Sequence, residues 1–417
     1  MLEKVDTGIL LHALSSVLSS VLLFLTNAVL AREVPNSAYA EFLIITSLLT
    51  IIQPLLQLNA TGMVQPLAAS SSPHKLLSFK ASYLALIIVT GTLLLSVSSL
   101  LRGESRHTLL LFYCLTLAMN EVVNLCALQV GHIKRFCLFI LSTRVAYLSL
   151  VCTCVYFGLV AVEAILAALC ASEFLSLSLK VALFPRESRA LSSRVVRQLR
   201  ERQVLRENCG RILKFGVVGV PLLVLPWVIQ GFDRLVMLDI FGERVLATYG
   251  AALAFSALFG SFNNLLSQIF GRIAFKRFDN DSLSIAELFS FSVAYFLFIC
   301  LFIFLISGYS EVLFALAYSE KYDLEQLSSF FLIGCLAHAF FGAYRIIALY
   351  SEFNLNQSIK IRSWAISSLC ALALFFFFRE SSHNAVASVP LVSSSILYFS
   401  ILFFTTWPPR KVLSSGV

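Results

Sequence analysis

Residues 180–214 read KVALFPRESRALSSRVVRQLRERQVLRENCGRILK, and they separate two long, strongly apolar halves of the chain. This basic segment holds ten Lys and Arg residues and three Glu residues, so its net charge is +7, whereas the complete chain of 417 residues has a formal net charge of +8. Nearly all of the excess positive charge therefore lies at the middle of the chain. The pattern predicts two hydrophobic bodies joined by one charged connection.

The composition on both sides of the basic segment is typical of a membrane protein. Hydrophobic residues make up 59% of the chain and charged residues 13%, whereas a soluble globular protein has about 25% charged residues. Apolar runs long enough to cross ~30 Å of hydrocarbon recur along the whole chain. The short alternating segments of a membrane β-barrel are not seen in the sequence. The sequence thus predicts an all-α polytopic membrane protein.

We expect twelve transmembrane helices, six before the basic segment and six after it. The first is expected to be retained, because Glu3 and Asp6 oppose the positive start of a signal peptide and the apolar stretch is too long for one. The predicted organisation is an N-terminal six-helix lobe over 1–183, a basic linker over 184–211 and a C-terminal six-helix lobe over 212–417. The expected spans are 7–30, 38–60, 76–101, 108–130, 136–157, 160–183, 212–238, 246–270, 285–307, 327–350, 361–378 and 385–406.

The distribution of Lys and Arg predicts the orientation in the membrane. With these spans, 22 of the 31 Lys and Arg residues fall on the side of the termini and the basic segment, and seven on the opposite side. Because cytoplasmic loops carry the excess of positive charge, both termini are predicted to be cytoplasmic.

The basic segment has two interpretations that the sequence leaves open. Residues 193–206 place valines and leucines among arginines, which is typical of an amphipathic helix lying on anionic lipid headgroups. The alternative is a solvated linker whose charge only sets the orientation. Nucleic-acid binding is not expected, because the segment has no aromatic platform and no recognised motif.

The two halves resemble each other at an offset of 210 residues. Glu33 corresponds to Glu243, and Tyr39 corresponds to Tyr249, in each case near the turn between the first and second expected spans of a half. Six spans per half give both halves the same orientation. The pattern suggests a parallel duplication about an axis along the membrane normal, as in many transporters.

Polar residues within the expected spans are the candidates for a substrate site, because ionisable groups in hydrocarbon are costly and usually face a bundle interior or a wet cavity. Arg144 and Arg345 lie near mid-span, and we expect them to line a cavity that attracts an anionic group such as a lipid-linked diphosphate. Guanidinium suits phosphate because it stays charged and binds bidentately. The further candidates for this cavity are His338, Glu121, Asn124, Asn263 and Asn264.

Two structural alternatives to the cavity also remain open. In the first, Arg144 forms an interhelical ion pair with Glu121 or Glu173. In the second, each acid or histidine in a span forms hydrogen bonds that hold the helices together. Glu173 is also a candidate for gating or ion coupling.

The seventh expected span holds the candidate gating residues. Pro221 and Pro226 interrupt it and remove backbone donors, which favours kinks. Such a helix acts as a gate or forms a static bend. Asp233 and Arg234 follow at its outer end, where they are expected to form a surface pair or part of a gate.

The sequence contains no signature of an enzyme. The motifs G-x-x-x-x-G-K-[ST], G-x-S-x-G and H-E-x-x-H are absent, and the expected loops are too short for a soluble catalytic domain. The ten cysteines show neither CxxC nor Cys/His metal spacing. We therefore expect no catalytic activity, metal or cofactor. An ion gradient of H⁺ or Na⁺, the membrane potential or the substrate gradient would supply the energy for transport.

Three local patterns carry a resemblance to a known family. The first is REVPNSAYA at 32–40, similar to R-x-L-G-P-x-x-Y-G without its two glycines. The second is LKFG at 213–216 with Pro221, followed by Asp233-Arg234 and ATYG at 247–250, similar to lkfg-x-P…DR…vG-x-Y. The third is AYSEKY at 317–322, similar to l-y-G-x-x-y with Ser319 in place of glycine. With the twelve-span layout, these patterns resemble the O-antigen and polysaccharide flippases of the multidrug/oligosaccharidyl-lipid/polysaccharide (MOP) exporter superfamily, which includes the MATE transporters.

This resemblance implies a V-shaped bundle of two six-helix lobes in the bacterial inner membrane. It implies alternating access and export of an undecaprenyl-diphosphate-linked oligosaccharide, such as an O-antigen repeat unit of lipopolysaccharide, to the periplasmic leaflet. The implied partners are this lipid-linked substrate, membrane lipids and polysaccharide polymerase or chain-length proteins. The alternative functions are an ion-coupled MATE-type exporter of small molecules and a membrane glycan polymerase or ligase.

Overall fold

The computed structural model describes a helical chain. Within the described residues there is no strand, and eight helical segments are long and apolar enough to cross a membrane, with three shorter apolar helices over 36–52, 81–92 and 108–120. The prediction of an all-α multi-pass membrane protein is confirmed, while twelve spans and cytoplasmic termini stay predictions. The described residues are 7–56, 79, 81–92, 105–129, 133–183, 189, 191, 193–197, 202–279, 284–318, 321–353 and 357–406.

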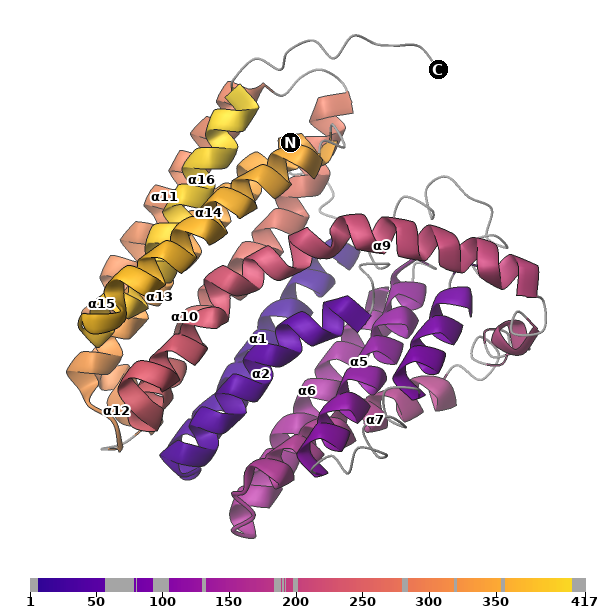
Figure 1. Cartoon of the computed structure of the whole chain (residues 1–417), viewed down its shortest axis with the longest axis horizontal. Coiled ribbons are helices and arrows are strands. Elements are labelled where there is room, and N and C mark those ends of the chain that lie inside the picture. The colour runs from indigo at the N-terminus through magenta and orange to yellow at the C-terminus, as the bar shows by residue number, and fades with distance from the viewer. Residues whose placement is uncertain are drawn as a thin grey trace. The chain divides into compact units, whose positions relative to one another are not determined.

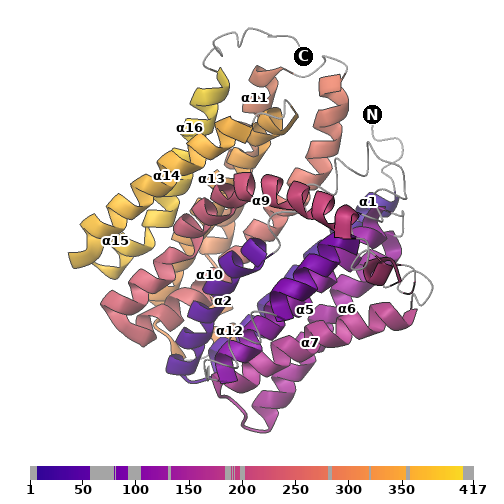
Figure 2. The same cartoon turned by 45° about the vertical axis from the view of Figure 1, so that its right-hand side comes forward.

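The chain forms two compact units, Met1–Trp227 (unit 1) and Val228–Val417 (unit 2). The boundary lies inside helix α9, past the expected start of the C-terminal lobe at residue 212. In unit 1, α5, α6 and α7 lie side by side (Figures 1 and 2). The labelled helices of unit 1 are α1 (Thr7–Glu33), α2 (Asn36–Leu56), α5 (Ser105–Gln129), α6 (Ile133–Tyr156), α7 (Val162–Leu183) and most of α9 (Arg202–Gln230).

The described part of the basic segment packs on unit 1. Val195 is buried in a cluster with Ala81 and Ala85 of the helix over 81–92, and Leu191 packs against the same cluster. Val196, the next residue, is exposed. The apolar side of the segment therefore contacts protein here, an arrangement that neither the headgroup nor the solvated-linker interpretation anticipated.

Unit 2 is arranged around α13, which packs on α10, α11 and α16. Helix α11 begins at a capping box, in which the Ser284 hydroxyl accepts from the Glu287 N–H and the Glu287 carboxylate accepts from the Ser284 N–H. The elements of unit 2 are α10 (Phe232–Asp279), α11 (Ile285–Ser307), α12 (Ser310–Tyr318), α13 (Leu324–Phe353), α14 (Gln357–Phe377), a 3₁₀ turn (Phe378–Glu380), α15 (His383–Ala387) and α16 (Val389–Thr406).

Helix α10 consists of two helical segments joined at Gly242. This glycine has φ 79°, ψ −179°, a backbone conformation that residues with a side chain rarely adopt. The Tyr249 hydroxyl donates to the Asp233 carboxylate, although the two residues are 16 positions apart. In an uninterrupted helix they would be separated by about 24 Å. The chain therefore turns back at Gly242, between the expected seventh and eighth spans.

The two tyrosines matched by the offset of 210 occupy comparable places within their own units. Tyr39 lies in the first turn of α2, just after the break that ends α1 at Glu33, and Tyr249 follows the break at Gly242. Both side chains are buried.

Candidate functional site

A buried polar cluster links α5 and α7 in unit 1. The Asn120 side-chain amide donates to both the Glu173 backbone carbonyl (2.8 Å) and the Glu173 carboxylate (2.7 Å). The Lys180 ammonium donates to the Asn120 side-chain oxygen at 2.7 Å. The exposed fractions of Asn120, Glu173 and Lys180 are 1%, 4% and 2%. The amide thus connects an acid and a base that are both removed from solvent.

The polar residues of α7 share one face of the helix. Glu173, Ser176 and Lys180 recur at spacings of three and four residues, which places them one above the other. Ser176 accepts a hydrogen bond of 2.6 Å from the hydroxyl of Thr143 on α6. Buried polar groups are costly unless they are hydrogen-bonded, and this face meets that requirement through α5 and α6.

Lys180 was not among the predicted site residues. It was counted with the basic segment, but the structure places it in the last turn of α7, where its ammonium also lies 5.5 Å from the centre of the Phe139 ring. The helical spacing from Glu173 through Ser176 to Lys180 was the signal in the sequence. The neighbouring arginines of the basic segment obscured it.

Arg144 lies on α6 beside this cluster. Its charge acts on Glu173, and its side chain is partly exposed. Among the described residues, none forms a hydrogen bond or ion pair with its guanidinium. Three residues further along α6, the Tyr147 hydroxyl is buried and has no hydrogen-bond partner among the described residues. The direct Arg144–Glu173 ion pair is therefore not formed, and the side chains of Glu121 and Asn124 lie outside the described residues.

In unit 2, three helices converge on Asn263. Its side-chain amide donates to the backbone carbonyl of His338 on α13 at 2.6 Å, and its oxygen accepts from the Tyr295 hydroxyl on α11. Asn263 itself belongs to α10. The structure thus brings together two predicted site residues, Asn263 and His338, and adds Tyr295, which the sequence did not single out.

Arg345 follows His338 by seven residues on α13, so both lie on one helix face. Its guanidinium is 4.8 Å from the centre of the Phe341 ring, and its charge acts on His338 and Tyr295. The side chain of Asn264, the remaining predicted residue of this group, lies outside the described residues. In each unit, a partly exposed arginine therefore borders a buried polar cluster.

Glycines allow the close approach of helices around Asn263. A Cβ atom on Gly342 would lie 2.6 Å from Asn263 Oδ1 and from the Tyr295 hydroxyl oxygen. A Cβ atom on Gly260 would lie 2.9 Å from the His338 ring. Both distances are too short for a side chain to be accommodated without movement, so the cluster depends on glycine at these positions.

The candidate gating residues are arranged differently from the prediction. Asp233 is buried, with an exposed fraction of 2%, and it accepts from the Tyr249 hydroxyl and from the backbone N–H of Arg234 at 2.9 Å. The interpretation of Asp233 and Arg234 as a surface pair is therefore wrong. Pro221 and Pro226 both lie inside α9, which is assigned as one helix through both positions.

A charged cluster joins the beginnings of three helices in unit 1. The Arg106 guanidinium on α5 pairs with Glu41 on α2 and with Glu163 on α7. All three side chains are about 40% exposed (39%, 40% and 38%). The sequence placed Arg106 and Glu163 near outer helix ends separately, and it gave no indication of Glu41.

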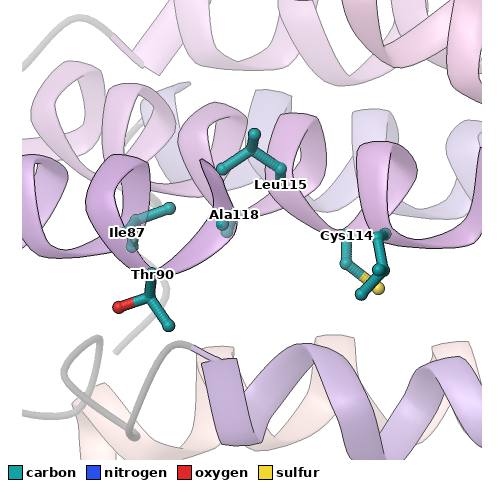
Figure 3. Close-up of a pocket in the computed structure, with 7 residues that line it drawn as sticks. Ile87, Thr90, Cys114, Leu115 and Ala118 are labelled. Atoms are coloured by element: carbon teal, nitrogen blue, oxygen red, sulfur yellow. The ribbon is translucent and has the colours of Figure 1, made fainter. Parts of the chain in front are cut away.

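Two further features complete the described sites. A small hollow lies between the helix over 81–92 and α5 (Figure 3), lined by Ile87, Thr90, Gly91, Leu111, Cys114, Leu115 and Ala118. Among the described residues, no group of three or more His, Cys, Asp or Glu residues is placed to hold a metal ion.

No protein-family model matches the chain, and no curated protein matches it in sequence. Solved structures do match. An inward-facing multidrug resistance MATE family transporter of the MOP superfamily has a TM-score of 0.69 at 13% identity, covering 92% of this chain and 93% of that one. The chain has the fold of the MOP superfamily transporters.

Two other solved structures with this fold illustrate its range. Lipid II flippase MurJ, in an inward closed conformation, has a TM-score of 0.65 at 13% identity over 95% of this chain and 87% of that one. A MOP superfamily transporter from Pyrococcus furiosus, described by the reverse polarity of its binding pocket, has a TM-score of 0.55 at 13% identity over 96% and 98%. Similar helical arrangements thus occur in a multidrug resistance transporter and in a lipid II flippase.

Proposed function

We propose that this chain is a flippase for an undecaprenyl-diphosphate-linked oligosaccharide, such as an O-antigen repeat unit, in the bacterial inner membrane. It moves the substrate from the cytoplasmic to the periplasmic leaflet by alternating access. The chain acts as a transporter, without catalysis, cofactor or metal. Membrane lipids and the enzymes that polymerise the exported units are its partners, and H⁺ or Na⁺ is the candidate coupling ion.

The observation that carries this proposal is the state of two arginines within the apolar helices, Arg144 on α6 and Arg345 on α13. Arg144 is a membrane-helix cation that no described residue pairs with, and Arg345 supplies a second partly exposed cation beside Tyr295 and His338. Guanidinium groups match the planar oxygens of a phosphate. A diphosphate carried on a lipid is the substrate class that this chemistry favours.

The second candidate is a MATE-type exporter of cationic small molecules, which the similarity to a multidrug MATE transporter supports. Such an exporter needs carboxylates that face its substrate. Here Glu173 is bonded to Asn120, and Asp233 is bonded to Tyr249. Both acids already have partners within the protein, which favours the flippase.

Replacing the two arginines tests the proposal in a strain that depends on this chain for its surface polysaccharide. We expect Arg144→Gln and Arg345→Gln each to reduce surface polysaccharide and to cause lipid-linked oligosaccharide to accumulate, at normal protein level. Arg32→Gln and Arg379→Gln are matched controls, because these side chains are 50% and 64% exposed at the surface.

The same strains separate the competing functions. Full export by both Arg144→Gln and Arg345→Gln would refute the anion site. Loss of drug efflux with unchanged polysaccharide on deletion of the gene would establish the MATE-type exporter. Extension of a glycan by the purified protein would establish a polymerase.

A further inference from the structure

The charges around Glu173 do not balance. One carboxylate, Glu173, lies among two cations, Lys180 and Arg144. The charge of Lys180 reaches Glu173 through one shared amide, because Asn120 accepts from the ammonium and donates to the carboxylate. Among the described side chains, the cluster therefore has one positive charge more than it has negative charges.

Geometry assigns the two cations different roles. Lys180 is 2% exposed and hydrogen-bonded within the cluster, so it is bound to the protein interior. Arg144 is partly exposed, and no described residue forms a hydrogen bond or ion pair with it. Within the described part of the chain, its five N–H donors therefore have no hydrogen-bonded partner, although the Glu173 carboxylate lies near enough for the two charges to interact.

We propose that Lys180 is a positioning residue, which compensates the charge of Glu173 through Asn120 and thereby leaves the Arg144 guanidinium available to an anionic substrate. This inference rests on the proposed function, in which Arg144 binds the diphosphate. Without the ammonium, Glu173 has one remaining cation nearby, and a buried carboxylate strongly favours a direct ion pair. Arg144 then pairs with Glu173 and is withdrawn from the substrate.

Binding of farnesyl diphosphate to the purified full-length protein in detergent tests this inference. Lys180→Met is expected to weaken binding roughly tenfold, in the range of coupling between contacting residues. The double variant Lys180→Met/Glu173→Gln removes the competing carboxylate as well, and we expect it to restore most of the lost affinity. Glu173→Gln alone binds at least as tightly as the wild type.

Two controls separate positioning from a general loss of structure. Lys180→Met/Glu163→Gln removes a different carboxylate of α7, one that bonds to Arg106 near the start of the helix, and should stay as weak as Lys180→Met. In an Arg144→Gln background, Lys180→Met should cause no further loss, because Lys180 acts through Arg144. A protein whose affinity fell only because its fold was damaged would not be restored by Glu173→Gln, and it would lose further affinity in the Arg144→Gln background.

Thermal unfolding of each variant monitors folding. If Lys180→Met does not fold, Lys180→Gln takes its place, since glutamine keeps a donor for Asn120 but carries no charge. The inference is overturned if the lysine variant binds as the wild type does, or if Glu173→Gln fails to restore its affinity. The failure of the proposed function is distinct from both results, since Arg144→Gln would then bind farnesyl diphosphate as tightly as the wild type.

Discussion

Among the described residues, each unit buries one carboxylate deeply, Glu173 or Asp233, and the two are stabilised in different ways. In unit 1, Glu173 is bonded to Asn120, which is 53 residues away, and two cations surround it. In unit 2, Asp233 is bonded to Tyr249, which is 16 residues away, and to the N–H of the next residue. The first acid belongs to a charge network between helices. The second joins the two helical segments that meet at Gly242.

The comparison separates a site candidate from a structural one. Asp233 receives its hydrogen bonds from a hydroxyl and a backbone group, and the cation that acts on it, Arg234, is its neighbour in the sequence. Glu173 shares its environment with Arg144 of another helix, with which no described residue forms a hydrogen bond or ion pair. We therefore expect Glu173 to be coupled to ligand binding and Asp233 to act in the fold alone.

We expect the largest difference between the two acids when each is replaced by its amide and the loss of stability is measured. Glu173→Gln leaves Lys180 and Arg144 without a counter-charge, and removing one member of a buried charge group costs about 3–5 kcal/mol. Asp233→Asn should cost only about 1 kcal/mol, because the Tyr249 hydroxyl can rotate and accept from the new amide. Thermal unfolding of the two purified variants measures the difference, and equal losses of stability would show that the two acids are stabilised alike.

Glycine substitutions compare the packing of the two units, and we expect them to have a smaller effect on stability. In Gly342→Ala, the new methyl group meets Asn263 and Tyr295, which are both hydrogen-bonded. Overpacking of this kind costs about 1–3 kcal/mol. Gly91→Ala in unit 1 is the matched control, because its methyl group meets the flexible end of the Leu115 side chain, which lines the small hollow (Figure 3) and forms no hydrogen bond that a shift would break.

The unfolding temperature of the two glycine variants decides this point. We expect Gly342→Ala to be clearly less stable and Gly91→Ala to remain near the wild type. If Gly91→Ala were the more damaging of the two, the tight packing attributed to unit 2 would instead be a property of unit 1.

Arg106→Gln should have the smallest effect, because partly exposed ion pairs contribute little and are screened by salt. We expect a slight decrease in the unfolding temperature at low ionic strength that disappears in about 1 M salt. Unfolding curves at two salt concentrations test this. A loss that persisted at high salt would place the Arg106 cluster with the buried charges of Glu173.

The sequence predicted the helical class and the membrane location, because these depend on composition and on the length of apolar runs. Both can be read along the sequence without knowing which helices are in contact. It also identified Arg144, Arg345, Asn263 and His338 as unusual, since polar groups within apolar helices stand out individually. It did not identify Lys180 and Tyr295, which bond to Asn120 and Asn263. These contacts join helices that are distant in sequence, and tyrosine or a terminal lysine is common enough to escape notice.

Among the described residues, side-chain hydrogen bonds join helices α5 and α7 at points spread along their length. Arg106 bonds to Glu163 near the start of both helices, and Asn120 bonds to Glu173 further on. The two anchor points on α5 are fourteen residues apart, or about 21 Å of helix. Two helices that are bonded at two separate points cannot rotate about one of them alone. Sliding one helix past the other by one turn would break both contacts. Helices α5 and α7 must therefore move as one piece in any motion that preserves these bonds.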